Sequence, residues 1–308
     1  MHDGLFLLNK PAGVSSRGYG IELKRKFGLK KVGHAGTLDL EATGLLLVLS
    51  GRALKLQNYL LDGSKVYSGN ILLGVSSDTD DVHGNCIATI DAEHKLKQIV
   101  QDEVLEKIKQ KFSPSYNQRP SLVSSKKING VSSRILVQQG ITPELKENFV
   151  QLEFEELDFK NFNELFYKVR VSKGFYVRAL ARDIGELLGV GGVAQTINRD
   201  EVNPYKLDEA VNLDKFESQE NVTIEDLGAS YKPLNQLSSL MPYQRVMLID
   251  QAEIGAFRSG NKAILDVIKA RKVEDENPEI FYSIVDCSEN FLGMVSIEDN
   301  IPSFKFVF

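Results

Sequence analysis

The feature that most constrains how this chain can fold is its mixture of short apolar or alternating segments with amphipathic helices. These segments do not follow a regular strand–helix–strand repeat. Gly44–Gly51 is an apolar run between glycines, and residues 150–154 and 166–171 alternate as half-buried strands do. The clearest helix is Tyr176–Leu188, whose apolar residues recur with a period near 3.6 and which Gly189 is suited to end. These patterns predict an α+β fold with a mixed, mainly antiparallel sheet flanked by helices. The same criteria predict a strand over 65–75 and helices over 53–61 and 98–112.

The last 70 or so residues are typical of a separate small module. An acidic, turn-rich stretch over 213–240 has the composition of a connector. Beyond it the sequence predicts one helix at 251–258 and short strands at 245–249, 281–285, 291–295 and 304–308. We therefore expect a larger domain over 1–235 and a small β-rich module over 236–308, which is too short to be very stable alone.

Composition excludes several classes of protein. With 308 residues, 42% hydrophobic and 26% charged, the chain has enough apolar material for a packed core and is not mainly disordered. No apolar run approaches the ~20 residues that cross a bilayer, and the N-terminus lacks the features of a signal peptide. Cys86 and Cys287 are too far apart for a CxxC motif, so neither a disulfide framework nor a cysteine zinc site is indicated. We expect a soluble, cytoplasmic protein.

Charge is unevenly distributed along the chain. The net charge of −5 does not favour a protein that coats nucleic acid. Residues 1–60, however, carry nine basic and four acidic side chains, a net of +5, whereas residues 201–240 carry three basic and eight acidic side chains, a net of −5. Such segregation can attract a polyanion to one face, although a basic run such as Lys24-Arg25-Lys26 is also consistent with an ordinary solvated helix face.

The segment Gly33–Gly44 is the strongest candidate for a functional loop, because it combines three glycines, two threonines, one histidine and two acids just before a buried strand. Asp39 could act as a nucleophile or stabilise charge at a sugar carbon, and His34 could contact a base or a phosphate. The alternative is that Asp39 and Thr37 cap turns while the glycines allow tight bends.

Two further clusters carry possible chemistry. Arg178 lies near a helix start, where a cation opposes the helix dipole, so a carboxylate or phosphate partner would explain it better than solvation alone. Lys65 and Tyr67 share one face of a predicted strand, and Tyr67 is either a core aromatic or a stacking platform for a base. His83 and His94 have no ligand-like spacing, so we predict no metal site.

Taken together, these clusters and several neighbouring motifs resemble one family. The chain is similar to the TruB family of tRNA pseudouridine synthases over nearly its whole length, through motifs that follow one another in the family's order: Leu8-Asn-Lys-Pro-Ala-Gly-Val-Ser-Ser16, Gly33–Gly44, Tyr59–Tyr67, Gly74–Gly84 with Ser77-Asp-Thr-Asp-Asp81, Lys127-Ile-Asn-Gly130, Ser172-Lys-Gly-Phe-Tyr-Val-Arg178 and Ile197–Tyr205. Six or more motifs in the correct order are far more specific than any one of them.

The resemblance implies roles for particular residues. Asp39 would be the catalytic aspartate, Tyr67 the tyrosine that stacks on the target uracil, and Arg178 the arginine that pairs with Asp39. Lys10 and Pro11 would belong to a structural motif beside the site, and residues 113–145 to a mobile RNA-clamping insertion. The C-terminal module would resemble a PUA-like domain that contacts the acceptor end. RNA contacts would be made by His34, Lys10, Lys65, Lys127, Lys173 and Arg199.

The activity implied by the resemblance is isomerisation of the T-loop uridine of tRNA, uridine 55, to pseudouridine, without metal or cofactor. The enzyme would be monomeric and standalone, with the tRNA T-arm as its partner and no protein partner or membrane needed. Two alternatives are a tRNA-folding chaperone or other RNA-binding protein, and a pseudouridine synthase that acts on another RNA. A glycoside hydrolase would need a second catalytic carboxylate, which the sequence does not clearly supply.

Overall fold

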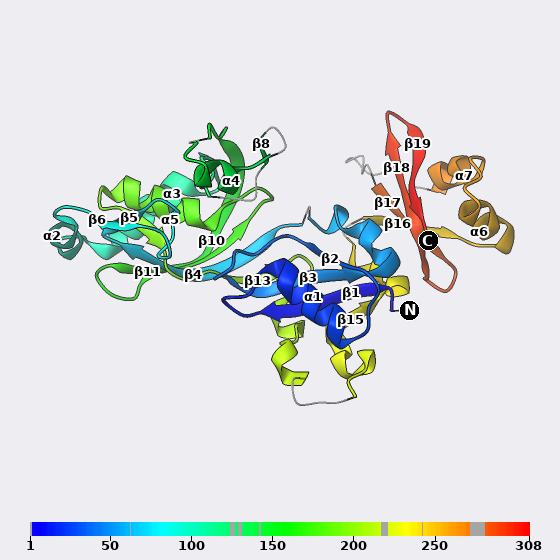
Figure 1. Ribbon diagram of the computed structural model, residues 1–308. Helices are drawn as coiled ribbons and strands as arrows, with labels where there is room; N and C mark the ends of the chain where they lie inside the picture. Colours follow the sequence, from blue (N-terminus) through cyan, green and yellow to red (C-terminus); the bar gives the residue numbers. More distant parts are fainter. Residues whose placement is uncertain are drawn as a thin grey trace. The chain divides into compact units, whose positions relative to one another are not determined.

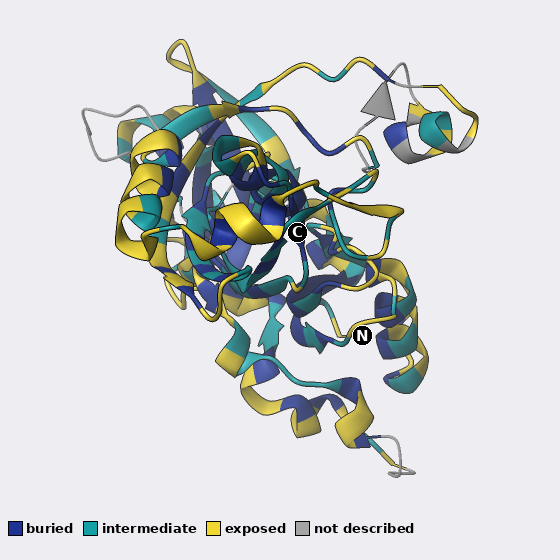
Figure 2. Ribbon diagram, turned by 90° about the vertical axis from the view of Figure 1, so that its left-hand side faces the viewer, coloured by how far each residue is buried: buried dark blue, intermediate teal, exposed yellow. Residues whose placement is uncertain are grey.

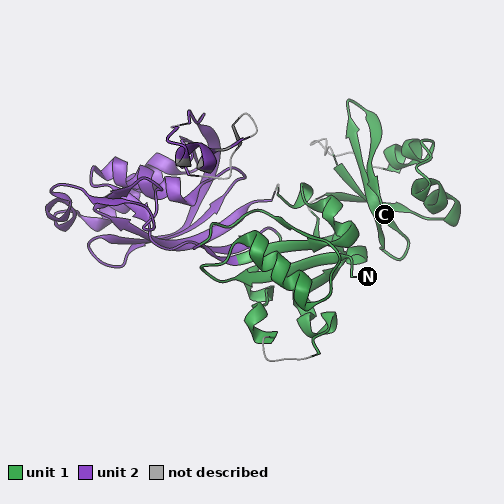
Figure 3. Ribbon diagram, in the orientation of Figure 1, with its two compact units in different colours: residues 1–40, 45–62, 204–308 green, residues 41–44, 63–203 purple. Residues whose placement is uncertain are grey.

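The computed structural model describes residues 2–61, 63–123, 127–128, 131–141, 143–216, 221–241, 243–271 and 281–308 (Figure 1). The chain forms two compact units (Figure 3). Unit 1 comprises residues 1–40, 45–62 and 204–308, and unit 2 comprises residues 41–44 and 63–203. Within the described residues, no helix combines the length and the apolar character that crossing a bilayer requires.

The first part of unit 1 is built on buried strands. Strand β1 (Gly4–Lys10) pairs antiparallel with β15 (Tyr231–Pro233), and β2 (Val32–Ala35) pairs antiparallel with β3 (Thr43–Ser50), the neighbour of β1. Residues 5–8 and 45–49 are completely buried, as expected for strands covered on both faces. Helix α1 (Ser16–Lys26) begins after Ser15, whose hydroxyl accepts a hydrogen bond from the amide of Gly18. Short 3₁₀ helices complete this part at Gly51–Leu56, Tyr59–Leu61, Leu207–Glu209, Leu213–Phe216, Ile224–Ser230 and Leu234–Leu240.

The C-terminal residues of unit 1 form a small β-rich module with its own sheet and core. Strands β16 (Gln244–Leu248), β17 (Phe281–Asp286), β18 (Phe291–Glu298) and β19 (Ile301–Val307) lie in that order, with only the β16–β17 pair parallel. Helices α6 (Gln251–Arg258) and α7 (Ile264–Arg271) pack on it through side chains such as Phe257 and Ile268. The predicted strands and α6 are confirmed. The sequence did not reveal α7, because eight residues with three buried apolar positions give a weak periodic signal.

Unit 2 contains an antiparallel sheet in the order β13–β4–β11–β10–β7, with β12 also pairing with β4. Its strands are β4 (Lys65–Leu73), β7 (Ser115–Gln118), β10 (Asn148–Phe159), β11 (Glu164–Val171), β12 (Gly192–Ala194) and β13 (Asn198–Val202). Two small two-stranded sheets are formed by β5 (Val75–Ser77) with β6 (Cys86–Ala88) and by β8 (Lys127–Ile128) with β9 (Val131–Ser132). The helices are α2 (Ala92–Lys97), α3 (Gln101–Phe112), α4 (Ser133–Gln138) and α5 (Val177–Leu188).

Helix α5 matches its predicted periodicity. Its apolar face, including Leu180 and Ile184, is completely buried in the core of unit 2, where it meets strand residues such as Val169. The helix ends at Gly189, which has φ +65°, a conformation that costs glycine little. Figure 2 shows the same division across the chain, with buried residues concentrated in the strands and exposed residues on the outer helix faces.

The predicted α+β class with a mainly antiparallel sheet is confirmed, and three local expectations need revision. Residues 53–61 form 3₁₀ turns rather than one α-helix. The stretch 213–240 is more than a connector, since β15 adds a strand to β1. Residues 115–118, placed at the start of the expected insertion, belong to the sheet through their pairing with β10. The division between residues 235 and 236 remains a prediction; by its contacts the C-terminal module groups with residues 1–40 and 45–62.

Candidate active site

The loop between β2 and β3 presents Asp39 to solvent while its backbone is held on both sides of that residue. On one side, the Ser16 hydroxyl donates to the carbonyl of Leu38 (3.0 Å) and accepts from its amide (2.9 Å). On the other side, the carbonyl of Leu40 accepts from the amide of Gly13 and from the Lys10 ammonium, each at 3.0 Å. Asp39 is therefore an exposed carboxylate on a rigidly supported loop, the arrangement expected of a reacting group.

Lys10 has a role in this structure that differs from the RNA contact expected of it. Its side chain is completely buried, and its ammonium donates to the carbonyls of Pro11 and Val14, both at 2.8 Å, as well as to Leu40. A buried ammonium is tolerated only when it is well hydrogen-bonded. Lys10 thus joins the turn after β1 to the Asp39 loop, as the resemblance to a structural motif beside the site implies.

His34 supports the same loop from β2. It lies opposite Val48 of β3, is half-buried, and its Nε2 is 3.1 Å from the hydroxyl of Thr37. This contact holds the imidazole of His34 against Thr37, which lies two residues before Asp39.

Tyr67 and its neighbours belong to unit 2. Tyr67 lies on β4 opposite Arg199 of β13 and Val169 of β11, and its half-buried ring packs at the margin of the core of unit 2. Lys65, two residues earlier on the same strand, is 8% exposed, and Arg199 is 1% exposed. Tyr67 is therefore only partly exposed, and the stacking role expected of it stays a prediction. Lys65 and Arg199 are buried, unlike the exposed RNA contacts expected of them.

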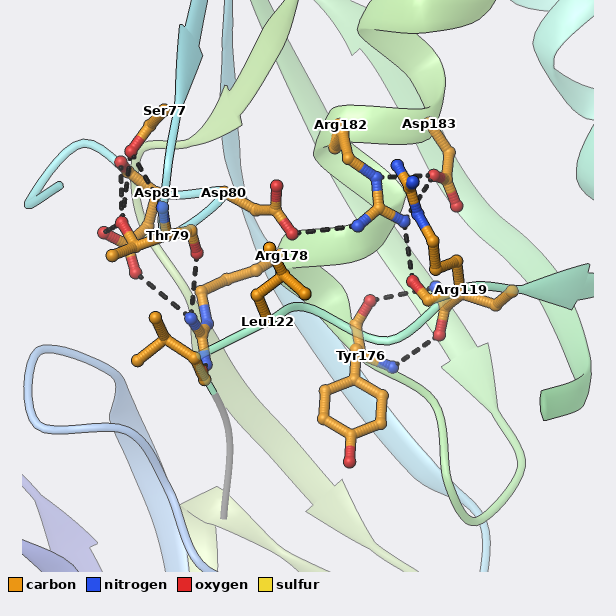
Figure 4. Close-up of polar contacts among 12 residues, drawn as sticks. Ser77, Thr79, Asp80, Asp81, Arg119, Leu122, Tyr176, Arg178, Arg182 and Asp183 are labelled. Atoms are coloured by element: carbon orange, nitrogen blue, oxygen red, sulfur yellow. Dashed lines mark hydrogen bonds and ion pairs between the residues drawn. The ribbon is translucent and has the colours of Figure 1, made fainter. Parts of the chain in front are cut away.

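Arg178 lies in the first turn of α5 and is almost completely buried (Figure 4). Its guanidinium donates to the carbonyls of Thr79 (2.9 Å) and Val123 (2.8 Å), and lies 3.6 Å from the carboxylate of Asp81. Arg178 therefore has an acidic partner, as expected from its position at the helix start. That partner, Asp81, belongs to the Ser77–Asp81 motif, to which the sequence assigned no role. The pairing of Arg178 with Asp39 stays a prediction.

Arg182, one helical turn after Arg178, is a functional candidate that sequence reasoning missed. Its guanidinium contacts the carboxylates of Asp80 (3.0 Å) and Asp183 (2.7 Å) and donates to the carbonyl of Arg119 (2.6 Å). Arg178 and Arg182 therefore join the same two segments, residues 79–81 and 119–123, to helix α5 (Figure 4). The available signal was their four-residue spacing, which places two arginines on one side of a helix whose neighbouring residues are apolar.

The carboxylates beside Arg182 are unusual because they are mostly buried. Burial raises the pKa of Asp80, although Arg182 acts in the opposite direction, and the same balance raises the pKa of Asp183. Burial also raises the pKa of Tyr116, whose hydroxyl lies 3.3 Å from Asp183. The two carboxylates, Asp80 and Asp183, depend on the guanidinium of Arg182 to remain charged inside the protein.

The start of α5 is held from a third direction. Tyr176 precedes the helix without a side-chain cap of its own. Instead the buried Gln118 of β7 accepts from the Tyr176 amide (2.8 Å) and donates to the Tyr176 carbonyl (3.0 Å). The helix turn that carries Arg178 is therefore fixed to the sheet through a residue that the sequence gave no reason to select.

The remaining candidates are less informative. Lys173 is exposed in the turn after β11, and its RNA contact stays a prediction. The backbone of Lys127 belongs to β8, but its side chain lies outside the described residues.

Comparison with known proteins identifies the family. Residues 24–177 match the model of the TruB family pseudouridylate synthase N-terminal domain. The proteins called tRNA pseudouridine synthase B of Corynebacterium diphtheriae and of Prochlorococcus marinus are 36% and 30% identical to this chain. The first match covers 75% of this chain and 79% of the relative, and the second covers 94% and 92%.

Solved structures support the same fold. A chain of a Cbf5–Nop10–Gar1 complex superposes with a TM-score of 0.69 at 18% identity, covering 98% of this chain and 83% of that one. A second, from an archaeal box H/ACA Nop10–Cbf5 complex, gives a TM-score of 0.66 at 18% identity, covering 96% and 79%. On the sequence matches, this chain belongs to the TruB family of pseudouridylate synthases and is accordingly an isomerase.

Proposed function

We propose that this chain converts the T-loop uridine of tRNA, uridine 55, into pseudouridine, with Asp39 as its catalytic carboxylate. The observation that carries the proposal is the exposed Asp39 carboxylate on a loop whose flanking residues are held by Ser16, Gly13 and Lys10. The names of the relatives support tRNA as the substrate.

The reaction needs little chemical machinery. The C1′–N1 bond breaks, the uracil turns, and a C1′–C5 bond forms while the proton on C5 leaves and N1 gains one. There is no net redox change and no energy source is needed, so we propose no metal or cofactor. One carboxylate can attack or stabilise the sugar or the base, whereas glycoside hydrolysis normally uses two carboxylates and a water. Water must be kept out while the base is detached, because hydrolysis would lose it.

Other residues would hold the substrate and the carboxylate. The target uridine is inside a folded loop, so it has to be turned out before it can react. We propose that Tyr67 stacks on the extruded uracil, that His34 helps to hold the nucleotide, and that Arg178 keeps Asp39 ionised by charge pairing. Lys173 would contact the RNA backbone. We further propose that the enzyme acts as a cytoplasmic monomer on the T-arm of tRNA.

The test is release of tritium from tRNA transcript that carries C5-tritiated uridine. Wild-type protein should release tritium, Asp39→Asn should not, and replacing the T-loop uridine should abolish release. Glu41→Gln is the matched control, because it removes another exposed carboxylate of the same loop. It should retain activity.

Two results would overturn the proposal. Wild-type protein that binds tRNA without releasing tritium would favour a tRNA-folding chaperone or a different RNA substrate. Tritium release that survives in Asp39→Asn but is lost in Glu41→Gln would show that Glu41, not Asp39, is the catalytic carboxylate.

A further inference from the structure

Unit 1 contains a cleft whose basic residues are used by none of the proposed catalytic steps. It has a volume of about 290 Å³ and lies between one face of α1 and residues 30–34. Arg17, Ile21 and Lys24 line it from the helix, at the i, i+4 and i+7 spacing that places side chains on one face. Lys30 and Lys31 line it from the segment that leads into β2. In the described part of the chain, no aspartate or glutamate lines this cleft.

The four cations of the cleft are exposed, and among the described residues none of their side chains has an ion pair or hydrogen bond. Three other cations of unit 1 are paired within the protein: Lys10 with backbone carbonyls, Arg52 with Asp3, and Lys232 with Glu209. Four like charges around one concave surface repel each other, and a bound polyanion relieves that repulsion. The cleft is therefore electrostatically complementary to phosphate.

The cleft and the candidate catalytic loop are linked through His34. His34 lines the cleft and also contacts Thr37, two residues before Asp39. A strand of nucleic acid in the cleft would therefore lie beside His34, which contacts this loop. Ile21, which is 51% exposed, adds an apolar surface beside the cations, as suits a nucleotide with its sugar and base better than a free phosphate ion.

We propose that this cleft binds the phosphodiester backbone of the RNA substrate next to the target nucleotide, with Arg17, Lys24, Lys30 and Lys31 as the phosphate-binding residues. The inference rests on the proposed function, since it assumes an RNA substrate at Asp39. It goes further by naming the surface that holds the flanking backbone.

The test compares two double variants with the same change in charge. Lys24→Gln with Lys30→Gln removes two cations of the cleft, and Lys107→Gln with Lys109→Gln removes two exposed cations of α3 that are distant in sequence and do not line it. The Kd for unmodified tRNA transcript is measured over a series of KCl concentrations, together with KM and kcat for tritium release. The association constant falls as salt rises, and each lost phosphate contact makes the slope of log K against log salt less steep by about one. The slope of the cleft variant should therefore be less steep than that of wild type by about two. Its KM should rise more than its kcat falls.

A third double variant, Lys24→Arg with Lys30→Arg, should restore binding if charge is what matters. Equal slopes for wild type, cleft variant and control would overturn the inference. So would weaker binding of the cleft variant with an unchanged slope, which would indicate structural damage. Inorganic phosphate that binds wild type but not the cleft variant, with tRNA affinity unchanged, would assign the cleft to free phosphate instead. Should the wild type release no tritium while the cleft variant still loses salt-dependent tRNA binding, the proposed function would fall and the assignment of the cleft would stand.

Discussion

Replacing Arg182 with methionine should destabilise unit 2 strongly, because it leaves two mostly buried carboxylates without their shared cation. The side chain of Arg182 is 13% exposed, and those of Asp80 and Asp183 are 10% and 15% exposed. Removing one partner from such a pair typically costs about 3–5 kcal/mol, since the remaining charge is buried and uncompensated. We expect a loss of about that size in the free energy of unfolding of Arg182→Met at pH 7.5.

The pH dependence distinguishes this cause from lost packing. Arg182 lowers the pKa of Asp80 and of Asp183, so its removal raises both pKa values further above the ordinary value of 3.8. A carboxyl group with a raised pKa in the fold costs stability once the pH exceeds the unfolded value, and the cost disappears as the pH falls below it. The deficit of Arg182→Met should therefore be clearly smaller at pH 5 than at pH 7.5.

The assay is urea unfolding followed by circular dichroism at both pH values. Arg119→Met serves as the control, because the Arg119 side chain is 58% exposed and its guanidinium lies 3.4 Å from the carboxylate of Glu186, which is also exposed. Such exposed pairs contribute about 1 kcal/mol or less. A double-mutant cycle that combines Arg182→Met with Asp80→Asn should give an interaction energy of about 1–3 kcal/mol between the two residues. The reasoning would be refuted by a loss below about 1 kcal/mol for Arg182→Met, or by an equal loss at the two pH values.

Three further predictions concern other parts of the chain. Burial raises the pKa of Tyr19 to about 12, and its hydroxyl donates to the side chain of Asn212 and accepts from the amide of Leu213. Because the unfolded tyrosine ionises at a lower pH, wild type should lose stability between pH 10 and 12. Urea unfolding of Tyr19→Phe should show a smaller loss over that range. Gly44→Ala should cost more than Gly28→Ala in the same assay, since both have positive φ but only at Gly44 would a Cβ meet backbone, 2.4 Å from the carbonyl oxygen of Arg199; equal costs would contradict this. Lys10→Met removes the ammonium that bonds the carbonyls of Pro11 and Val14 and one of the two donors to the carbonyl of Leu40. It should therefore destabilise the fold by about 1–3 kcal/mol and lower kcat for tritium release more than it weakens tRNA binding; an unchanged kcat would argue against a positioning role.

The sequence alone was enough to predict the fold class, most strands and the helix that carries Arg178. Those features depend on local periodicity and on residues such as Gly189, whose conformational freedom acts within a few residues of its own position. The loop Gly33–Gly44 could also be selected as a candidate, because it combines glycines, threonines, a histidine and two acids just before a buried strand. The same residues suit tight turns, so the catalytic role of this loop stays a prediction.

Tertiary structure decided which side chains support that loop and which are available to a ligand. Lys10 and Lys24 are equally basic in the sequence, yet one is buried among carbonyls and the other lines an open cleft. Asp80 and Arg182 are 102 positions apart, so no local pattern shows their contact. Burial and long-range pairing arise only when distant segments pack together, and they determine whether a given charge stabilises the fold or remains free to meet a substrate.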